Sequence, residues 1–427
     1  MQRNRMNLRG CCEPVAVTGI GLITAQGCGA EQSWRGIQSG VDVLRPWDQP
    51  LPEALRHLRV AACPEYSRPS DIPSLLWSRL ARTQQLACIA VDEAFRAAGL
   101  PKRQKVNDPP MGCFVATTVC GMDLSERFYQ QYRVDPNDAD INLMRRLEPY
   151  EVLALLSRRH RLRGPGYLNL TTCVGSAMAL GAACDSIRAG RCDRAVAGGT
   201  EALCQLSISG FNSLRLVAAE GCRPFDVNRR GITLGEGAAM LVLESVHSAR
   251  QRGVEPIGYI TGFAATCDAY HITKPEPTGT QAANAIRRAL GAAGLAPHQI
   301  GYINAHGTGT HDNDATESVA LHQVFDTPGE RSEFPPVSST KRLTGHTFGA
   351  AGAIEAAICL LALRDGVLPP NAGLCDPDPQ CNLPLVRAAM SSRIASALSC
   401  NLAFGGNNTA LVFARGDDRL NAVEAQL

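Results

Sequence analysis

Short apolar runs bounded by glycine or by polar clusters alternate with longer helical stretches along most of the chain. The β-branched run at 14–24 predicts a buried strand, and the run at 112–118 predicts a second one. Residues 42–73 are rich in proline and arginine and predict surface loop, whereas residues 77–100 predict a helix that ends at a glycine followed by a proline. Residues 122–161 are polar, and we expect them to form an inserted helical cap.

A clear strand–helix–strand signal follows this cap. Residues 167–172 (YLNLTT) predict a strand, residues 173–190 predict a helix rich in glycine and alanine, and residues 194–202 (RAVAGGTEA) predict another strand. The apolar run at 238–243 closes this first half. Such alternation of strands and helices is typical of an α/β fold.

The second half repeats this order of elements. Strands are predicted at 257–266 and 300–305, with a helix at 279–294 between them. A short strand at 337–339 then precedes a second small-residue helix at 349–366.

The two small-residue helices align with each other when one is shifted by 174 positions. This shift places Gly175 on Gly349 and matches five of nine positions, although alanine-rich helices also match by chance. We interpret the match as an internal duplication, with one half at 12–250 and the other at 251–416. Two such halves predict a mixed or parallel sheet in each, covered by helices, with the small-residue helices as the buried middle layer.

The composition is that of an ordinary globular protein. Of 427 residues, 45% are hydrophobic and 19% are charged, and 42 basic against 40 acidic side chains give a formal net charge of +2. A disordered or fibrous chain is excluded, and there is no basic surplus for binding nucleic acid. We find neither a secretory signal nor an apolar run long enough to cross a membrane, so we expect a cytoplasmic protein without a membrane span.

The 17 cysteines are scattered along the chain, in an odd number and without any C-x-x-C pair. A disulfide-framed secreted fold or a zinc ribbon would need regular pairs. We therefore expect most of them to be buried thiols that act as small hydrophobic residues in a reducing cytosol.

One cysteine, Cys173, lies at the predicted strand-to-helix junction in L-T-T-C-V-G-S. A helix N-terminus lowers the pKa of a thiol placed there and leaves backbone N–H groups unpaired, which suits a nucleophile beside an oxyanion. A buried structural thiol is the ordinary alternative for any single cysteine. The small-residue helix after it and two histidines elsewhere in the chain favour the nucleophile.

Two histidines and a lysine lie in glycine-rich or hydroxyl-rich loops of the second half. His306 follows a predicted strand in N-A-H-G-T-G-T, where it has room to face a cleft, although a loop histidine bonded to backbone is the ordinary alternative. His346 comes five residues after Lys341 in S-S-T-K-R-L-T-G-H. Lys341 would ordinarily be a solvated charge, but the small residues around it predict burial. Glu355 lies in an apolar helix, needs a partner there, and would find it in Lys341.

One cysteine and two histidines on separate loops fit an acyl-transfer site, with a nucleophile and acid–base or oxyanion donors. The same residue types occur in papain-like proteases, but the surroundings C-G-S-C-W are absent. The glycine-rich runs near 19, 235 and 404 do not match a phosphate-binding loop. We expect these runs to form turns, one of which could add an N–H donor for an oxyanion.

The motifs together resemble the β-ketoacyl-acyl carrier protein synthases, and most closely the elongating, KAS II-like enzymes of type II systems. The matching segments cover about 14–414 and are, in order, V-A-V-T-G-I-G, T-T-C-V-G-S-A, R-P-F-D-x-x-R, L-G-E-G-A, N-A-H-G-T-G-T, S-S-T-K-R-L-T-G-H-T-F-G-A-A-G and A-F-G-G-N-N. The resemblance implies a thiolase-like α/β fold of five layers, αβαβα, built from two similar halves. It also implies a decarboxylative Claisen condensation of an acyl chain with malonyl-acyl carrier protein, giving 3-oxoacyl-acyl carrier protein in fatty-acid or polyene/polyketide elongation.

The resemblance also implies roles for individual residues. Cys173 would hold the acyl chain as a thioester, and His306 and His346 would support decarboxylation and stabilise the enolate. Lys341 would order the site, with Glu355 as its acidic partner.

The same resemblance identifies a gate and a site for the substrate arm. Phe404 and Gly405 would belong to the gating and oxyanion loop, where the N–H of Phe404 would act together with that of Cys173. Thr308 and Thr310 would hold the phosphopantetheine arm of acyl carrier protein. This chemistry needs no metal and no cofactor, because the substrates are carried on that arm.

Two positions near the acyl channel depart from the family pattern. Ile232 and Leu402 stand where family members usually have phenylalanine. We expect the freed space to favour a wide or rigid chain, such as a polyene or an aryl starter, over a saturated one. Arg79 and Arg215 match family positions for docking an acidic carrier protein, with solvated surface arginines as the alternative.

A function of a different class is a non-catalytic, chain-length-factor-type partner subunit in a ketosynthase heterodimer. Such subunits typically lack the nucleophile, whereas Cys173 and both histidines are present here, so we expect catalysis. A thiolase would show a second cysteine in C-x-G near the C-terminus, and Cys400 is followed by Asn-Leu-Ala. We expect acyl carrier protein as a partner, and a homodimer or a heterodimer with a ketosynthase-like chain-length partner.

Overall fold

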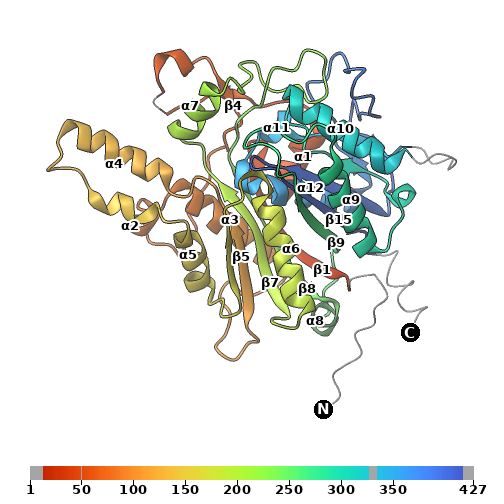
Figure 1. The fold of residues 1–427 in the computed structure, drawn as a ribbon. Helices are drawn as coiled ribbons and strands as arrows, with labels where there is room; N and C mark the ends of the chain where they lie inside the picture. Colours follow the sequence, from red (N-terminus) through yellow and green to blue (C-terminus); the bar gives the residue numbers. More distant parts are fainter. Residues whose placement is uncertain (1–12, 50, 327–333, 417–427) are drawn as a thin grey trace.

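The computed structural model describes residues 13–49, 51–326 and 334–416 (Figure 1). Its core is a mixed sheet of eleven strands, ten of which form one continuous path. The order from the centre toward one edge is β1 (Val15–Thr24), β8 (Gly237–Ser245), β7 (Arg194–Glu201), β5 (Met111–Ala116) and β6 (Gly166–Asn169). The order toward the other edge is β9 (Gly258–Cys267), β15 (Asn407–Ala414), β14 (Ser396–Leu402), β10 (Ile303–Asn304) and β11 (Val337–Ser338).

The two half-sheets have the same topology. In each, the first strand in the chain is antiparallel to the last, and the last is antiparallel to the one before it. The next two neighbours in each half are parallel. The two first strands, β1 and β9, meet antiparallel at the centre. A random repeat of alanine would not reproduce this order, so the fold is an internal duplication.

The two half-sheets and three layers of helices together make five layers, αβαβα. The buried middle layer contains α6 (Gly175–Arg188) and α12 (Ala351–Asp365), which pack on each other and on strands of both halves (Figure 1). Every residue of α12 from Ala351 to Leu363 is buried. The outer layers contain α3 (Arg82–Ala97) and α5 (Tyr150–His160) on one half, and α9 (Thr280–Ala293) and α10 (His311–Phe325) on the other. The predicted α/β class and five-layer order are confirmed.

The middle helices approach closely because their contact residues are small. A Cβ atom on Gly352 would lie 2.8 Å from Cβ of Ala177, which is closer than real side chains approach. The hydroxyl of Ser176 also accepts the N–H of Ala353 at 2.9 Å. These contacts bring the N-termini of α6 and α12 together, and the candidate site lies at this point.

Each middle helix begins with a 3₁₀ turn of the same form. The turns are η3 (Thr172–Val174) before α6 and η5 (Phe348–Ala350) before α12. The first residue of each has a positive φ, 40° at Thr172 and 43° at Phe348. The equivalent positions are therefore 176 residues apart, and Cys173 corresponds to Gly349. The alignment by 174 positions was wrong by two residues, because alanine-rich helices match in more than one register.

The segment expected to be one inserted cap has two parts. Helix α4 (Met122–Val134) and the 3₁₀ turn η2 (Ile141–Arg146) extend away from the sheet (Figure 1). Helix α5 instead buries Val152 and Leu156 in the core against α3 and β5, so it belongs to the repeated fold. The helix predicted at 77–100 is α3, which begins only at Arg82, and a separate short helix, α2 (Ser74–Trp77), precedes it.

The remaining elements lie around this core. They are β2 (Gly27–Cys28), β3 (Arg45–Pro46), β4 (Arg59–Val60), β12 (Val367–Leu368), β13 (Met390–Ser391), α1 (Ala30–Ser39), α7 (Gln205–Ser213), α8 (Val246–Arg252), α11 (Lys341–Thr344) and the turns η1 (Glu53–Leu55) and η4 (Pro297–Gln299). The boundary predicted at 250 falls within α8, and residue 12 lies outside the described part of the chain. Within the described residues, no helix is both long and apolar enough to cross a membrane.

The cysteines of the described residues are all free thiols, and most of them are buried. This agrees with the expectation that they act as small hydrophobic residues. Cys11 and Cys12 lie outside the described residues.

Candidate active site

Cys173 lies in the turn between β6 and α6. The preceding Thr172 has a φ of 40°, a strained conformation for a β-branched residue, and such strain commonly occurs at functional sites. The turn directs the thiol out of the helix end, while the N–H of Cys173 donates no backbone hydrogen bond within the described residues. This N–H is therefore free to bind an oxyanion.

The thiol of Cys173 is buried, with 7% of the residue exposed. Burial raises its pKa to about 12, although nearby Lys341 and the backbone N–H of Cys173 oppose the rise. The expectation of a lowered thiol pKa at the helix end was therefore wrong, because loss of hydration outweighs the favourable charges. The resting side chain of Cys173 is therefore a thiol, and it would need a base to react as a nucleophile.

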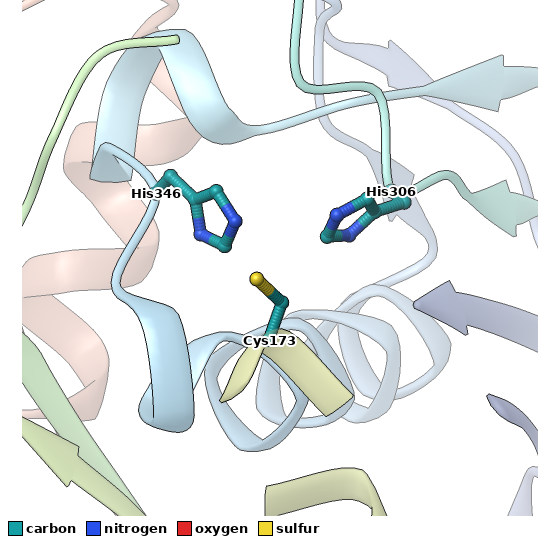
Figure 2. A group of neighbouring side chains, drawn as sticks. All are labelled: Cys173, His306 and His346. Atoms are coloured by element: carbon teal, nitrogen blue, oxygen red, sulfur yellow. The ribbon is translucent and has the colours of Figure 1, made fainter. Parts of the chain in front are cut away.

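Two histidines from the second half face this thiol. His306 directly follows the end of β10, and His346 lies between α11 and η5. Figure 2 shows the two imidazole rings on either side of the sulfur. One ring nitrogen of each histidine and Sγ of Cys173 lie within 4.8 Å of one another. The ring centroids are 5.3 Å apart at an interplanar angle of 86°.

The backbone fixes the proton position in one histidine but not in the other. The N–H of Phe348 donates to Nδ1 of His346 at 3.3 Å, so Nε2 carries the proton of the neutral ring. Nδ1 of His306 has no partner among the described residues. His306 is held instead through its backbone, because Glu317 accepts the N–H groups of His306 and Gly307 at 2.6 and 2.7 Å.

Both histidines are uncharged at neutral pH. Burial lowers the pKa of His306 and of His346 well below the ordinary value, and the nearby Lys341 lowers both further. A neutral imidazole can donate an N–H to an anion or accept a proton from a thiol.

Lys341 is almost fully buried and pairs with Glu355, as predicted from their apolar surroundings. The second carboxylate oxygen of Glu355 accepts the side-chain amide of Asn401. Burial raises the pKa of Glu355, and Lys341 opposes that rise. Neither Lys341 nor Glu355 lines the cavity.

A cavity of about 420 Å³ leads to Cys173 and both histidines. It is lined, among others, by five residues that the sequence singled out: Ile232, Thr308, Thr310, Leu402 and Phe404. The hydroxyls of Thr308 and Thr310 lie 2.9 Å apart, so they form one polar patch on a mainly apolar wall. Such a patch is suited to hold a polar substrate arm while an apolar chain lies beyond it.

The loop at 403–406, which the resemblance identifies as a gate, contributes one free N–H donor and not two. The N–H of Phe404 donates no hydrogen bond within the described residues, whereas the N–H of Gly405 donates to the carbonyl of Ile272 at 2.8 Å. Gly405 is therefore not an oxyanion donor in this conformation. Phe211, which the sequence did not single out, stacks on Phe404 and packs against Phe348, with ring centroids 5.8 and 5.2 Å apart.

The two candidate docking arginines lie in different places. Arg215 lines the cavity, together with Arg230 and Lys274. Arg79 is exposed and lies outside the lining. It lies near Asp140, whose pKa is lowered mainly by hydrogen bonds from Asn142 and further by the charge of Arg79. The structure therefore brings Arg215, but not Arg79, to the cavity.

Cys173, His306 and His346 also have the ligand types of a metal centre, since their ligand atoms are mutually close. The buried ammonium of Lys341 is near enough to lower the pKa of both histidines, and the same charge would repel a divalent cation. The arrangement fits a nucleophile with two hydrogen-bond donors better than a metal site.

Two domain families match the chain. Residues 12–249 match the beta-ketoacyl synthase N-terminal domain, and residues 257–374 match the beta-ketoacyl synthase C-terminal domain. Nodulation protein E of Rhizobium leguminosarum bv. trifolii is 35% identical over 404 residues, covering 93% of this chain and 98% of that protein. The 3-oxoacyl-acyl-carrier-protein synthase 2 of Staphylococcus aureus (strain COL) is 32% identical over 415 residues, covering 93% and 97%.

A solved structure is similar over nearly the same length. A chain of the ishigamide ketosynthase/chain length factor superposes with a TM-score of 0.87 at 30% identity, covering 95% of this chain and 100% of that one.

Proposed function

Because the chain belongs to the β-ketoacyl synthase family, we propose that Cys173 carries the growing acyl chain and that His306 and His346 serve the malonyl substrate. The protein is a ketosynthase-type acyltransferase that condenses an acyl chain with malonyl-acyl carrier protein by a decarboxylative Claisen reaction. The resemblance that the sequence motifs suggested is confirmed. The single observation that supports these residue roles is the meeting of one thiol and two neutral imidazoles within 4.8 Å at the cavity.

Acyl transfer to the enzyme is the first half-reaction. Sγ of Cys173 attacks the acyl thioester as its proton passes to His306, whose Nδ1 has no other partner. The tetrahedral oxyanion lies against the free N–H groups of Cys173 and Phe404, and one such donor contributes roughly 3 kcal/mol. The C–S bond to the carrier arm then breaks, and the departing thiolate takes the proton from His306.

Condensation is the second half-reaction. The C–C bond to the malonyl carboxylate breaks, CO₂ leaves, and the electron pair forms an enolate of the thioester. Nε2–H of His346 and an N–H of His306 stabilise the enolate oxygen. The enolate carbon attacks the acyl group on Cys173, and the 3-oxoacyl chain leaves on the carrier arm. The thiolate of Cys173 takes up one proton, so the step consumes one proton in all.

We propose a specialised, rigid or polyunsaturated acyl chain as the preferred substrate. Ile232 and Leu402 are aliphatic and buried at the cavity wall, and Phe211 offers a stacked aromatic face beside Phe404. A flat conjugated chain can lie along such a face. The similarity to the ishigamide ketosynthase/chain length factor supports a specialised product, whereas the similarity to 3-oxoacyl-acyl-carrier-protein synthase 2 supports ordinary fatty-acid elongation.

Acyl carrier protein is the proposed partner, and its phosphopantetheine arm would lie along Thr308 and Thr310. Arg215, at the cavity, is the better placed of the two arginines to meet an acidic carrier protein. We propose a dimer, formed with a second copy or with a chain-length partner. No cofactor is proposed, and the free thiols of the described residues support a cytoplasmic location.

The residue roles are tested with the two half-reactions measured apart. Cys173→Ala should abolish condensation but still release CO₂ from malonyl-acyl carrier protein, because both imidazoles remain. A Cys173→Ala variant that still elongates would contradict the assignment of the nucleophile. A wild-type protein that neither accepts an acyl group nor releases CO₂ would favour the non-catalytic partner subunit.

A further inference from the structure

Glu201, the last residue of β7, is a fully buried carboxylate outside the cavity lining. It accepts four hydrogen bonds: from the hydroxyl of Thr117 at 3.0 Å and from the N–H groups of Thr118, Val119 and Gly349 at 2.7, 2.9 and 3.0 Å. All four partners are donors. Burial raises the pKa of Glu201 to about 7, and the four donors oppose that rise by stabilising the ionised carboxylate.

The bond to Gly349 lies at the duplicated counterpart of the nucleophile. Cys173 and Gly349 are the second residues of equivalent turns, each after a residue of positive φ and each leading into a middle helix. In the first turn the N–H of Cys173 is free for a substrate oxyanion. In the second turn the equivalent N–H donates to the carboxylate of Glu201. In the second half, the N–H that corresponds to the one free in Cys173 is therefore already bound to a carboxylate of the protein itself.

This second turn sets the orientation of a catalytic histidine. Phe348 precedes Gly349, and its N–H is the group that donates to Nδ1 of His346. Resting on the function proposed above, we propose that Glu201 is a positioning residue that anchors η5 so that His346 presents its Nε2–H to the enolate. Glu201 does not line the cavity, so in this proposal it acts through η5 and not by contact with substrate.

The close packing around the carboxylate of Glu201 leaves little room for a side chain at position 349. A Cβ atom on Gly349 would lie 2.9 Å from Oε2 of Glu201 and 3.0 Å from the backbone of Thr117. A side chain at 349 would therefore displace either the carboxylate or the turn. Glu201→Gln would put an amide NH₂ against N–H donors and remove acceptors from the turn.

The test compares Glu201→Gln and Gly349→Ala with the wild type in both half-reactions. Displacement of a catalytic group by about 1 Å can cost 100-fold in rate, so we expect CO₂ release and condensation to fall about 10- to 100-fold. KM for malonyl-acyl carrier protein should stay near the wild-type value, and acyl transfer to Cys173 should change by less than about threefold.

Glu93→Gln is the matched control. Glu93 is a half-buried carboxylate that accepts the N–H groups of Leu22 and Ala30 at 2.9 and 2.7 Å, outside the cavity lining. Glu93→Gln should lose stability without the selective loss of CO₂ release. ¹⁵N spectra of the imidazole of His346 give an independent reading, because loss of the Phe348 bond should change the populations of the two tautomers in Glu201→Gln but not in Glu93→Gln.

The proposal is overturned if Glu201→Gln slows both half-reactions equally, as a general loss of folding would, or if the His346 tautomer and CO₂ release stay as in the wild type. Failure of the wild type itself to release CO₂ would reject the proposed function instead, so the two failures are distinguishable.

Discussion

Phe348 donates its backbone N–H to Nδ1 of His346 at 3.3 Å, and this bond leaves Nε2 as the protonated nitrogen. The amide nitrogen of glutamine can reach the place of Nε2, whereas that of asparagine reaches only the place of Nδ1. His346→Gln should therefore keep part of the CO₂ release, and His346→Asn should lose it about 100- to 1000-fold, the usual effect of removing one oxyanion donor. Equal losses in the two variants would contradict the assigned tautomer. Steady-state CO₂ release from malonyl-acyl carrier protein is the measurement.

Cys173 should react with iodoacetamide as a buried thiol. Burial raises its pKa to about 12, so the thiolate fraction is small at neutral pH and rises about tenfold per pH unit through pH 9. The alkylation rate of a free thiol with a pKa near 8.5 would instead begin to level off as the pH approaches 9. Mass spectrometry of the peptide that contains Cys173, with glutathione as the reference, follows the rate. A plateau of alkylation near pH 7 would show instead that Lys341 and the helix end outweigh burial.

Lys341 and Glu355 form a buried ion pair, so removing one partner should cost more than removing both. Lys341→Met leaves the carboxylate of Glu355 without its cation, at a cost of about 3–5 kcal/mol in the free energy of unfolding. The double variant Lys341→Met/Glu355→Leu should recover part of that loss. The free energies of unfolding of the wild type and both variants, measured in urea at pH 8, check this order of stability. A double variant less stable than Lys341→Met would contradict the account.

The aliphatic cavity wall should set substrate preference. Restoring phenylalanine at Ile232 and Leu402 would fill part of the 420 Å³ cavity beside the aromatic face of Phe211. Differences of this size discriminate by about 1–3 kcal/mol, so we expect a shift in preference and not an exclusion. The wild type should favour a polyunsaturated over a matched saturated acyl-carrier protein in kcat/KM, and Ile232→Phe/Leu402→Phe should shift toward the saturated one. A wild type that favours the saturated chain, unchanged in the variant, would mark an ordinary fatty-acid elongase.

The sequence predicted those parts of the site that lie in contiguous motifs. Cys173 and His306 follow strands, His346 precedes a middle helix, and small residues surround all three; the structure brings them together. The pairing of Lys341 with Glu355 followed from elementary electrostatics, because a charged side chain in an apolar helix needs a partner. These inferences depend only on local pattern.

Other features depend on contacts between distant segments, which no local pattern reveals. The hydrogen bond to Nδ1 of His346 and the four bonds to Glu201 depend on the packing of the duplicated turns. The raised pKa of Cys173 depends on burial by the second half, which outweighs the helix end considered from sequence. Glu201 was identifiable only as a carboxylate at the end of an otherwise apolar strand.

The central claim is that Cys173 carries the acyl chain, and intact-protein mass spectrometry tests it most directly. After incubation with acyl-acyl carrier protein alone, the wild type should gain the mass of one acyl group, located on the Cys173 peptide and removed by hydroxylamine. Adding malonyl-acyl carrier protein should discharge it as a 3-oxoacyl chain, and Cys173→Ala should gain no mass. An acyl group on another residue, or no acyl group on the wild type under conditions of active turnover, would contradict the account.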